Sequence, residues 1–390
     1  MKKTVFGLDF IKTNNRFFES KRKKIDLKSK WSWQPHDMNA ALREEAVAFG
    51  HDLAVKTNYR PGKKRKSVIL IFNFGLLNSQ LIQAAEAAGV EFFFLNYLNF
   101  SEGGEIHVDL NHPEQSYLAF EGAKLLLRDI RAVFWAPILI KERWSFFDYS
   151  PRSTFDTSEI LFESRWMYFL RNLEGLLGPE TLWLPGVPEQ GSQEKQNKIT
   201  DYAVASRHGF AVPDLIFSNE PESILKFHQG HSRVLFREFS NPPYIYYPRN
   251  SGITQIRSSK ESLSLSPCVF QEYVDKSYEL RAVIFLDQVH AFRIDSQNSE
   301  VSKEDWRVND VRKVEWRTVR LPRRIQKKLI QLIQAQGLSW GAVDLIVQDS
   351  GRMVYLETNR PGSTLFLEGL TGFNFGQHVI EAIRKSWSPL

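Results

Sequence analysis

Two acidic side chains and one amide near the C-terminal end of the chain have the types and spacing that a divalent cation requires. The stretch 340–362 (WGAVDLIVQDSGRMVYLETNRPG) predicts two strands joined by a short polar turn of the hairpin type. Asp344 lies in the first strand. Glu357 and Asn359 share one face of the second strand, because side chains alternate along a strand.

The register of this hairpin decides whether the two acids face each other. If Val347 pairs with Val354, Asp344 falls opposite Glu357. Facing carboxylates repel each other and cost stability unless a cation neutralises them. A hard divalent cation with all-oxygen ligands would do so, and Mg²⁺ is the usual ion where phosphates complete the shell. The alternative is a solvent-facing hairpin with scattered acids.

A second hairpin, within residues 268–297, carries charges of both signs. A three-residue loop over 286–288 would place Ile284 and Phe292 on one face of the hairpin and four charged side chains on the opposite face: Glu279, Arg281, Arg293 and Asp295. Two arginines on one sheet face favour an anionic partner such as phosphate or carboxylate, which guanidinium groups bind in a bidentate manner. A solvated charged surface is the alternative.

Length and composition indicate a soluble chain with two or three packed units. The chain has 390 residues, of which 42% are hydrophobic and 13% aromatic, enough for a sizeable core. A single cysteine, Cys268, excludes an internal disulfide and fits a reducing compartment. The sequence has neither a signal-peptide pattern nor an apolar run of about eighteen residues, so we expect a cytoplasmic protein without a membrane span.

Positive charge is concentrated at the N-terminus. Residues 1–66 hold 17 Lys and Arg against 7 Asp and Glu, whereas the remaining 324 residues hold 34 basic and 38 acidic side chains. This basic N-terminal extension could bind an acidic partner or nucleic acid, although a solvated arm is the commoner explanation for such charge runs.

The body of the chain begins after the extension with an α/β pattern. Apolar strands at 67–74, 90–97 and 131–137 alternate with helical segments such as 79–89, which indicates a parallel α/β layer over residues 67–185. Its first strand is not followed by a glycine-rich phosphate loop, so this unit carries neither a dinucleotide nor a P-loop motif.

Two further units follow this layer. Residues 186–266 combine a helix at 194–208 with short strands around 232–239 and 244–248, which suits a small lid that closes over a ligand. Residues 267–390 hold both charged hairpins and therefore most of the candidate chemistry. The whole chain is expected to have an α/β (α+β) fold.

The motifs in these units occur in an order that is specific in combination: QNKITDYAVASRHGFAVPD (196–214), VLFREFS (234–240), FQEYVDKSYELRAVIFLDQVHAFRIDSQ (270–297), EDWR (304–307), WGAVDLIV (340–347), LETNRPG (356–362) and LFLEGLTG (365–372). Over about residues 130–385 this order resembles the ATP-grasp superfamily, and within it the microviridin-type (graspetide) ligases that modify ribosomally made peptides. The resemblance implies an N-terminal α/β domain, a central lid and a C-terminal antiparallel-sheet domain, with ATP between the last two.

The same resemblance implies roles for residues that would bind ATP and Mg²⁺. Lys198 matches the first phosphate-binding lysine, and Arg237 stands where such ligases usually carry a second lysine. The resemblance implies three metal ligands, which are Asp344, Glu357 and Asn359. The remaining nucleotide contacts would come from the hinge and from residues near the ribose: Gln271, Glu272, Tyr273, Val274, Lys276 and Glu279.

Catalytic roles follow from the resemblance in the same way. Arg281 and Arg293 would face the γ-phosphate and the acyl-phosphate region. Asp305 and Arg307 are candidates for shaping the acceptor site, with a structural ion pair as an equal alternative. Relatives often carry Asn-Pro-Asn-Gly after the metal glutamate, whereas this chain has the sequence 359–362 (NRPG), which adds a cation near the acceptor side.

The implied activity is that of an ATP-dependent ligase. It would activate an Asp or Glu carboxylate of a precursor peptide as an acyl phosphate and form an ester or amide cross-link. One alternative is a ligase that attaches a free amino acid or amine to a peptide or small acid, and another is a non-catalytic, nucleotide-gated binding protein. Many ATP-grasp ligases are dimers, so the resemblance also allows for a homodimer.

Overall fold

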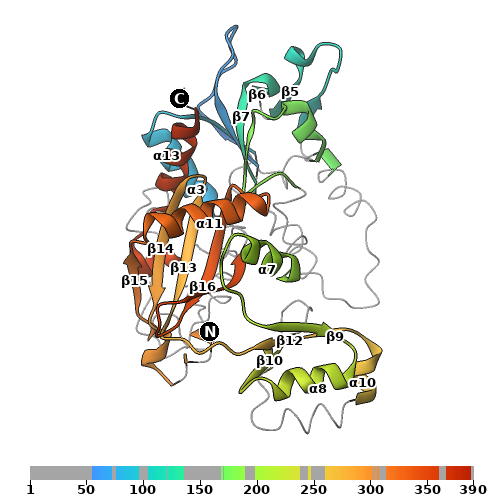
Figure 1. Ribbon diagram of the computed structural model, residues 1–390. Helices are drawn as coiled ribbons and strands as arrows, with labels where there is room; N and C mark the ends of the chain where they lie inside the picture. The colour runs from blue at the N-terminus through green and yellow to red at the C-terminus, as the bar shows by residue number, and fades with distance from the viewer. Residues whose placement is uncertain are drawn as a thin grey trace, which may run out of the picture.

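Three units follow one another along the described part of the chain (Figure 1). The computed structural model describes residues 55–72, 76–95, 104–120, 122–135, 168–169, 171–188, 198–237, 245–246, 260–300, 302–303, 305–306, 313–359 and 366–387. Most of the basic N-terminal extension, together with Arg307 and Arg360, lies outside these residues. Within them, none of the helices combines the length and the apolar composition needed to span a membrane.

The N-terminal unit contains a five-stranded sheet with the order β1-β3-β2-β7-β8. Its strands are parallel except β1, which runs antiparallel to β3. The parallel α/β layer expected from the sequence is therefore confirmed. Its elements are β1 (Val55–Thr57), β2 (Val68–Phe72), α3 (Leu76–Ala87), β3 (Glu91–Leu95), β7 (Ile130–Trp135) and β8 (Leu182–Leu184).

Because of strand β1, the N-terminal boundary of this unit lies earlier in the chain than expected. It pairs with β3, and the nearby Tyr59 is buried, with its hydroxyl donating to Asp129 over 2.7 Å. The unit therefore begins before residue 67, inside the segment assigned to the basic extension. A separate antiparallel sheet of the same unit consists of β4 (Glu105–His107), β5 (Tyr117–Phe120) and β6 (Ala123–Leu126).

The central unit is a small four-stranded sheet with the order β11-β10-β12-β9 and helices along it. It forms its own small core from residues such as Ile224, Val234 and Phe270. In Figure 1 it lies at the bottom, apart from the other two sheets. After α7 (Lys198–Arg207), its elements are β9 (Leu215–Ser218), α8 (Pro221–Gln229), β10 (Val234–Arg237), β11 (Ile245–Tyr246), α10 (Lys260–Leu265) and β12 (Cys268–Glu272).

The C-terminal unit is an antiparallel five-stranded sheet with the order β15-β14-β13-β16-β17, as expected. Figure 1 shows α11 and α7 across one of its faces. The elements are β13 (Tyr278–Phe285), β14 (Gln288–Ile294), β15 (Trp316–Val319), α11 (Arg323–Ala335), β16 (Trp340–Val347), β17 (Met353–Asn359), α12 (Phe366–Thr371) and α13 (Phe375–Trp387).

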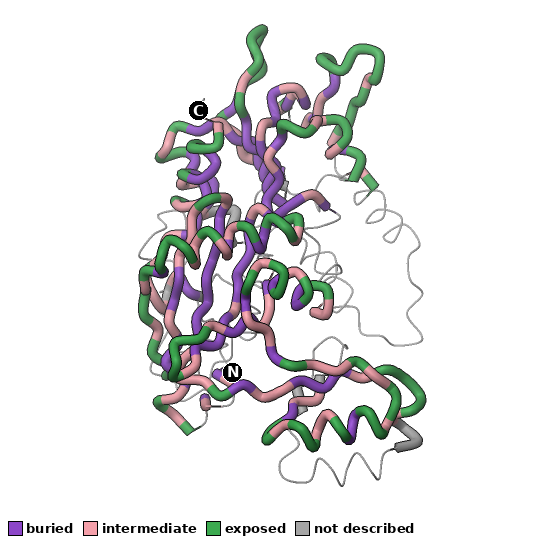
Figure 2. The backbone as a smooth tube through the Cα atoms, viewed as in Figure 1, coloured by how far each residue is buried: buried purple, intermediate pink, exposed green. Residues whose placement is uncertain are grey.

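Each face of this sheet packs on a different partner, and the buried strands run through the middle of the molecule in Figure 2. On the first face, side chains such as Phe285 and Trp340 share a core with the N-terminal sheet and with α3 and α13. The helices α3 and α13 approach so closely that a Cβ on Gly376 would lie 2.5 Å from the carbonyl oxygen of Gln80. On the second face, Leu280 and Ala282 pack on α7 and α11.

The turn between β13 and β14 is shorter than expected. Phe285 pairs with Gln288, so the loop has two residues, Leu286 and Asp287, and Leu286 has a positive φ of 53°. The three-residue register predicted from the sequence is therefore wrong by one position. That register assumed that charged and aliphatic side chains segregate by face, whereas both faces here carry a mixture of the two.

Candidate active site

The β16–β17 hairpin brings the two predicted acids together. Asp344 is the cross-strand partner of Glu357, and Asn359 follows on the same face as Glu357. The register shifts between Asp344 and Leu345, so the far end of the hairpin pairs one residue away from the expected match of Val347 with Val354. This bulge explains why the expected facing of the acids is confirmed although the pairing used to derive it is wrong.

Basic and amide groups surround the two carboxylates. The Arg281 guanidinium donates two hydrogen bonds to Asp344, from Nε over 2.8 Å and from Nη2 over 2.7 Å. The Asn359 amide donates to the same carboxylate over 2.9 Å, and the Lys198 ammonium donates to Glu357 over 2.7 Å. We call these five residues the acidic corner. Two side-chain cations thus balance two carboxylates that face each other.

The acidic corner has the donor chemistry that Mg²⁺ requires. Asp344 and Glu357 are only 14% and 13% exposed, and both point from neighbouring strands toward the same side of the sheet. Their carboxylate oxygens and the amide oxygen of Asn359 make an all-oxygen set, and Mg²⁺ is usually held by one or two carboxylates together with phosphate oxygens. The residues present therefore fit this ion.

Helix α7 positions Lys198 at the acidic corner. The helix begins at Lys198 and packs its Tyr202 ring edge-on against Tyr355 of β17. The Tyr202 hydroxyl donates to the buried side chain of Gln271, over 2.8 Å. Burial raises the pKa of Tyr355, which keeps its hydroxyl neutral in this packed junction. Gln271 thus links strand β12 of the lid to the helix that carries Lys198, rather than facing solvent.

Glu279, expected at the ribose, lies on the same face as Arg281 in β13. Its carboxylate is buried, pairs with Lys276 and accepts a hydrogen bond from Ser296 over 3.2 Å. The structure therefore brings the predicted pair Lys276 and Glu279 together. Ser296 lies within the motif 270–297 but was not predicted, because its contact with Glu279 forms only when the hairpin folds.

Two of the expected hinge amides are already used within the lid. The Glu272 N–H donates to the Asp214 carbonyl over 2.9 Å, and the Tyr273 N–H donates to the Arg233 carbonyl over 3.0 Å. Val274 follows them and packs with Ile346 of the C-terminal sheet in a small apolar cluster on the face of the acidic corner. Of the residues predicted at the hinge, Val274 therefore lies where the lid meets the candidate site.

Arg293 is separated from this site by the sheet. The observed register pairs Arg281 with Phe292 and Leu280 with Arg293, so the two arginines point to opposite faces. Arg293 donates to Asp295 over 2.7 Å, and its guanidinium lies 3.9 Å from the ring centre of Tyr278. The expectation that both arginines share one face is therefore wrong. The two-residue turn reverses the face on which Arg293 falls.

The remaining predicted residues are described only in part. Arg237 lies in β10 opposite Val269, but its side chain is outside the described part, as is Arg307. Asp305 is partly buried and precedes Trp306, a buried ring that lies 5.3 Å from the guanidinium of Arg281. Trp306 was not predicted, although its place within the EDWR motif offered a signal.

No protein-family model matches this sequence, and no curated protein matches it. Several solved structures, in contrast, match this chain. A RiPP-associated ATP-grasp ligase of Chryseobacterium gregarium, in complex with ADP and a leader and core peptide, is 19% identical, with a TM-score of 0.65 over 83% of this chain and 98% of that chain. The chain therefore has the ATP-grasp fold.

Two further structures match with similar coverage. The macrocyclase MdnC of Microcystis aeruginosa MRC, bound with the precursor peptide MdnA, is 22% identical, with a TM-score of 0.62 over 82% of this chain and 99% of that chain. The ATP-grasp ligase PsnB, complexed with a phosphomimetic variant of its minimal precursor, Mg and ADP, is 16% identical, with a TM-score of 0.61 over 83% and 99%. The expected resemblance to ATP-grasp ligases of ribosomal peptides is confirmed at the level of structure.

Proposed function

We propose that this chain is an ATP- and Mg²⁺-dependent ligase that activates a side-chain carboxylate of a ribosomally made precursor peptide. The observation that carries the proposal is the acidic corner, in which Asp344, Glu357 and Asn359 converge next to Arg281 and Lys198. Such a set suits a triphosphate held through a bridging divalent cation. The similar ligases, which were solved with ADP and peptides, support the same assignment.

In the proposed site, each group has a distinct task. Asp344, Glu357 and Asn359 would hold Mg²⁺, which when bound neutralises phosphate oxygens and orients them. Lys198 and Arg281 would exchange their carboxylate partners for phosphate oxygens, because guanidinium and ammonium groups bind both anions. The apolar cluster around Val274 and Ile346 would receive the adenine ring.

The proposed reaction has two steps. A substrate carboxylate oxygen attacks the γ-phosphorus of ATP, the bond to the β-phosphate oxygen breaks, and ADP leaves. A hydroxyl or amine of the peptide then attacks the acyl carbon, a proton is lost, and phosphate leaves with formation of an ester or amide bond. The protein contributes positioning and charge neutralisation, which are the main sources of catalysis in phosphoryl transfer.

Peptide-dependent release of ADP, followed by mass spectrometry of the peptide, tests this function. Peptides that combine Asp or Glu with Ser, Thr or Lys should stimulate ADP release and lose the mass of one water for each cross-link formed. An Asp344→Ala variant should be inactive. Peptide-independent turnover that is unchanged in this variant would refute the ligase. A gain in mass equal to an added amine minus water would instead identify the alternative, attachment of a free amino acid or amine.

A further inference from the structure

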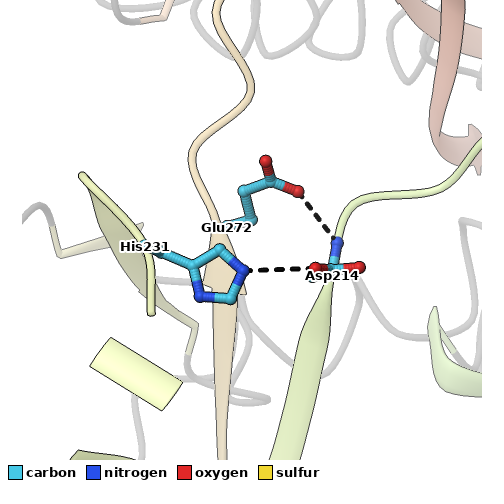
Figure 3. A group of neighbouring side chains, drawn as sticks. All are labelled: Asp214, His231 and Glu272. Carbon is cyan, nitrogen blue, oxygen red and sulfur yellow. Dashed lines mark hydrogen bonds and ion pairs between the residues drawn. The ribbon is translucent and has the colours of Figure 1, made fainter. Parts of the chain in front are cut away.

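Three side chains of metal-binding type meet at one end of the lid sheet (Figure 3). Asp214 directly precedes β9, His231 follows α8, and Glu272 ends β12. Their ligating atoms all lie within 4.8 Å of one another, and they form the one such group among the residues that the structure describes. We call them the lid triad.

The imidazole of His231 is held in one orientation. Its Nδ1 lies 2.8 Å from the carbonyl oxygen of Phe227, one helical turn earlier, and its ring packs 4.4 Å from the Phe227 ring. A carbonyl oxygen only accepts, so Nδ1 carries the hydrogen. In neutral histidine the other nitrogen, Nε2, then bears a lone pair.

That lone pair faces a carboxylate. The Nε2 atom of His231 lies 3.2 Å from Oδ2 of Asp214, as Figure 3 shows. Two hydrogen-bond acceptors at this distance repel each other unless a cation lies between them. The cation can be a proton on Nε2 or a metal ion that both atoms bind.

We propose that the lid triad is a Zn²⁺ site. Two ligands about 2.0–2.1 Å from a tetrahedral Zn²⁺ are about 3.3 Å apart, which agrees with the 3.2 Å between His231 Nε2 and Asp214 Oδ2. A backbone carbonyl on the second imidazole nitrogen is the usual support for a metal-bound histidine, and Phe227 provides it. Imidazole favours Zn²⁺ over Mg²⁺, so this site would not compete for the ion of the acidic corner.

Backbone contacts prepare the other two ligands. The Glu272 N–H donates to the Asp214 carbonyl over 2.9 Å, and one Glu272 carboxylate oxygen accepts from the Asp214 N–H over 3.1 Å. The second oxygen of that carboxylate would bind the metal. Asp214 is 75% exposed, so water can fill a fourth position.

The place of the triad gives the metal a structural effect. Glu272 ends the strand from which the chain passes to Val274 at the junction with the C-terminal sheet. A metal bound to Asp214, His231 and Glu272 would tie β9, the end of α8 and β12 together at this point. Zinc would therefore stiffen the hinge end of the lid.

Calorimetric titration of the full-length protein with ZnCl₂, in excess Mg²⁺ and in an Asp344→Asn background that disables the acidic corner, tests the proposal. We expect one Zn²⁺ per chain. A His231→Gln change should weaken binding by at least about tenfold. The matched control is His208→Gln, because His208 also approaches a carbonyl one turn earlier, Val204, over 2.9 Å, but lies outside the triad. This control should bind Zn²⁺ as tightly as the background protein.

Absorption of bound Co²⁺ gives a second measurement, since its visible bands change when an imidazole ligand is lost. An Asp214→Asn change, which keeps the side-chain shape, should also weaken Zn²⁺ binding if His231→Gln fails to fold. Equal binding with and without the triad side chains, or no binding by the background protein, would overturn the proposal. The cation between His231 and Asp214 would then be a proton, consistent with the raised pKa of His231, which arises chiefly from the Phe227 carbonyl.

Discussion

The two faces of the C-terminal sheet give an arginine side chain different surroundings. Arg281 and Arg293 belong to one hairpin, but Arg281 is 4% exposed and grips Asp344 with two hydrogen bonds, whereas Arg293 is 36% exposed and pairs with Asp295 on the other face. The two arginines have the same charge and lie close together in the sequence. They differ in the face of the sheet on which they lie and in the neighbouring strand, which is β16 for Arg281 and β15 for Arg293.

This difference shows which position on the sheet makes an arginine part of the candidate active site. Arg281 lies beside β16, whose Asp344 is in turn opposite Glu357, so its charge joins a network that would receive phosphate. Arg293 lies beside β15, the edge strand, where Arg317 also reaches Asp295 over 3.1 Å. A buried ion pair that loses one partner costs far more than an exposed one.

The largest effect should follow from removing Arg281. In Arg281→Met, Asp344 remains buried without its bidentate partner, so we expect a loss of about 3–5 kcal/mol in the free energy of unfolding. ATP turnover should fall by about 100-fold or more, because a positioned cation at the phosphates is lost. Urea denaturation and an ADP-release assay measure the two effects.

A double variant separates the two consequences of losing Arg281. Arg281→Met combined with Asp344→Leu removes both charges, so most of the lost stability should return, since apolar replacement of a buried ion pair is often neutral or stabilising. Activity should not return. Recovery of both, or unchanged stability in the single variant, would show that Arg281 and Asp344 do not form the coupled pair described above.

Much of this site could be predicted from the sequence. Period-two alternation placed Asp344, Glu357 and Asn359 on one face, and the resemblance to ATP-grasp ligases implied that Lys198 lies near them. The parallel first unit, the lid and the antiparallel sheet followed from the same patterns. These features depend on local periodicity and on the order of elements, which a single sequence records.

The features that could not be predicted depend on details of strand pairing and folding that local sequence patterns do not determine. A turn of two residues instead of three needs Leu286 at a positive φ, which is uncommon for a residue that is not glycine. The bulge beside Asp344 changes the pairing of half a hairpin without changing its hydrophobic pattern. The contact of Arg281 with Trp306 joins residues that only the folded chain brings together.

A smaller effect should follow at Lys198, which is 25% exposed and pairs with Glu357 over 2.7 Å. In Lys198→Met, Glu357 keeps its charge without a competing ammonium, so Mg²⁺ should bind more tightly in the absence of ATP. The KM for ATP should rise by about tenfold, because a phosphate contact is lost. Titration with Mg²⁺ and steady-state kinetics measure these opposite changes.

Glu357→Gln is the matched counterpart of the Lys198 change. It removes the carboxylate and should weaken Mg²⁺ binding, whereas Lys198→Met should strengthen it. If both variants bind Mg²⁺ equally well, Glu357 is not a ligand, and the Mg²⁺ ligands from the protein would be Asp344 and Asn359 alone.

Arg293 should show a still smaller effect. Arg293→Ala removes a partly exposed partner of the buried Asp295 and a stacking contact with Tyr278, but Arg317 still reaches Asp295, so the change should cost about 1 kcal/mol. ATP turnover should remain within about threefold of the unmodified protein. A loss of turnover as large as that of Arg281→Met would restore Arg293 as a catalytic residue and would remove the contrast between the two faces.

The effect that is smallest at neutral pH lies at the far end of the face that carries Arg281, and it should be visible only in acid. His290 is the cross-strand partner of Val283, and its ring packs against Phe373 and His378 where the sheet meets α13. Burial lowers the pKa of His290 to about 4; the positive charge of His378 also lowers it, and the negative charge of Glu381 opposes the shift. Its Nε2 has no hydrogen-bond partner among the described residues, so a proton there would be poorly solvated.

Because the pKa of His290 in the folded protein lies below its value of about 6.5 in the unfolded chain, the unfolded chain binds the proton more readily. The contribution of neutral His290 to stability is therefore fully present above about pH 6.5 and is lost as the pH falls toward about 4. His290→Phe keeps an aromatic ring and removes the titration, so its free energy of unfolding should fall less between about pH 7 and about pH 5 than that of the unmodified protein. Chemical denaturation at both pH values measures the difference, and parallel losses in the two proteins would show that His290 does not titrate as a buried base on this face.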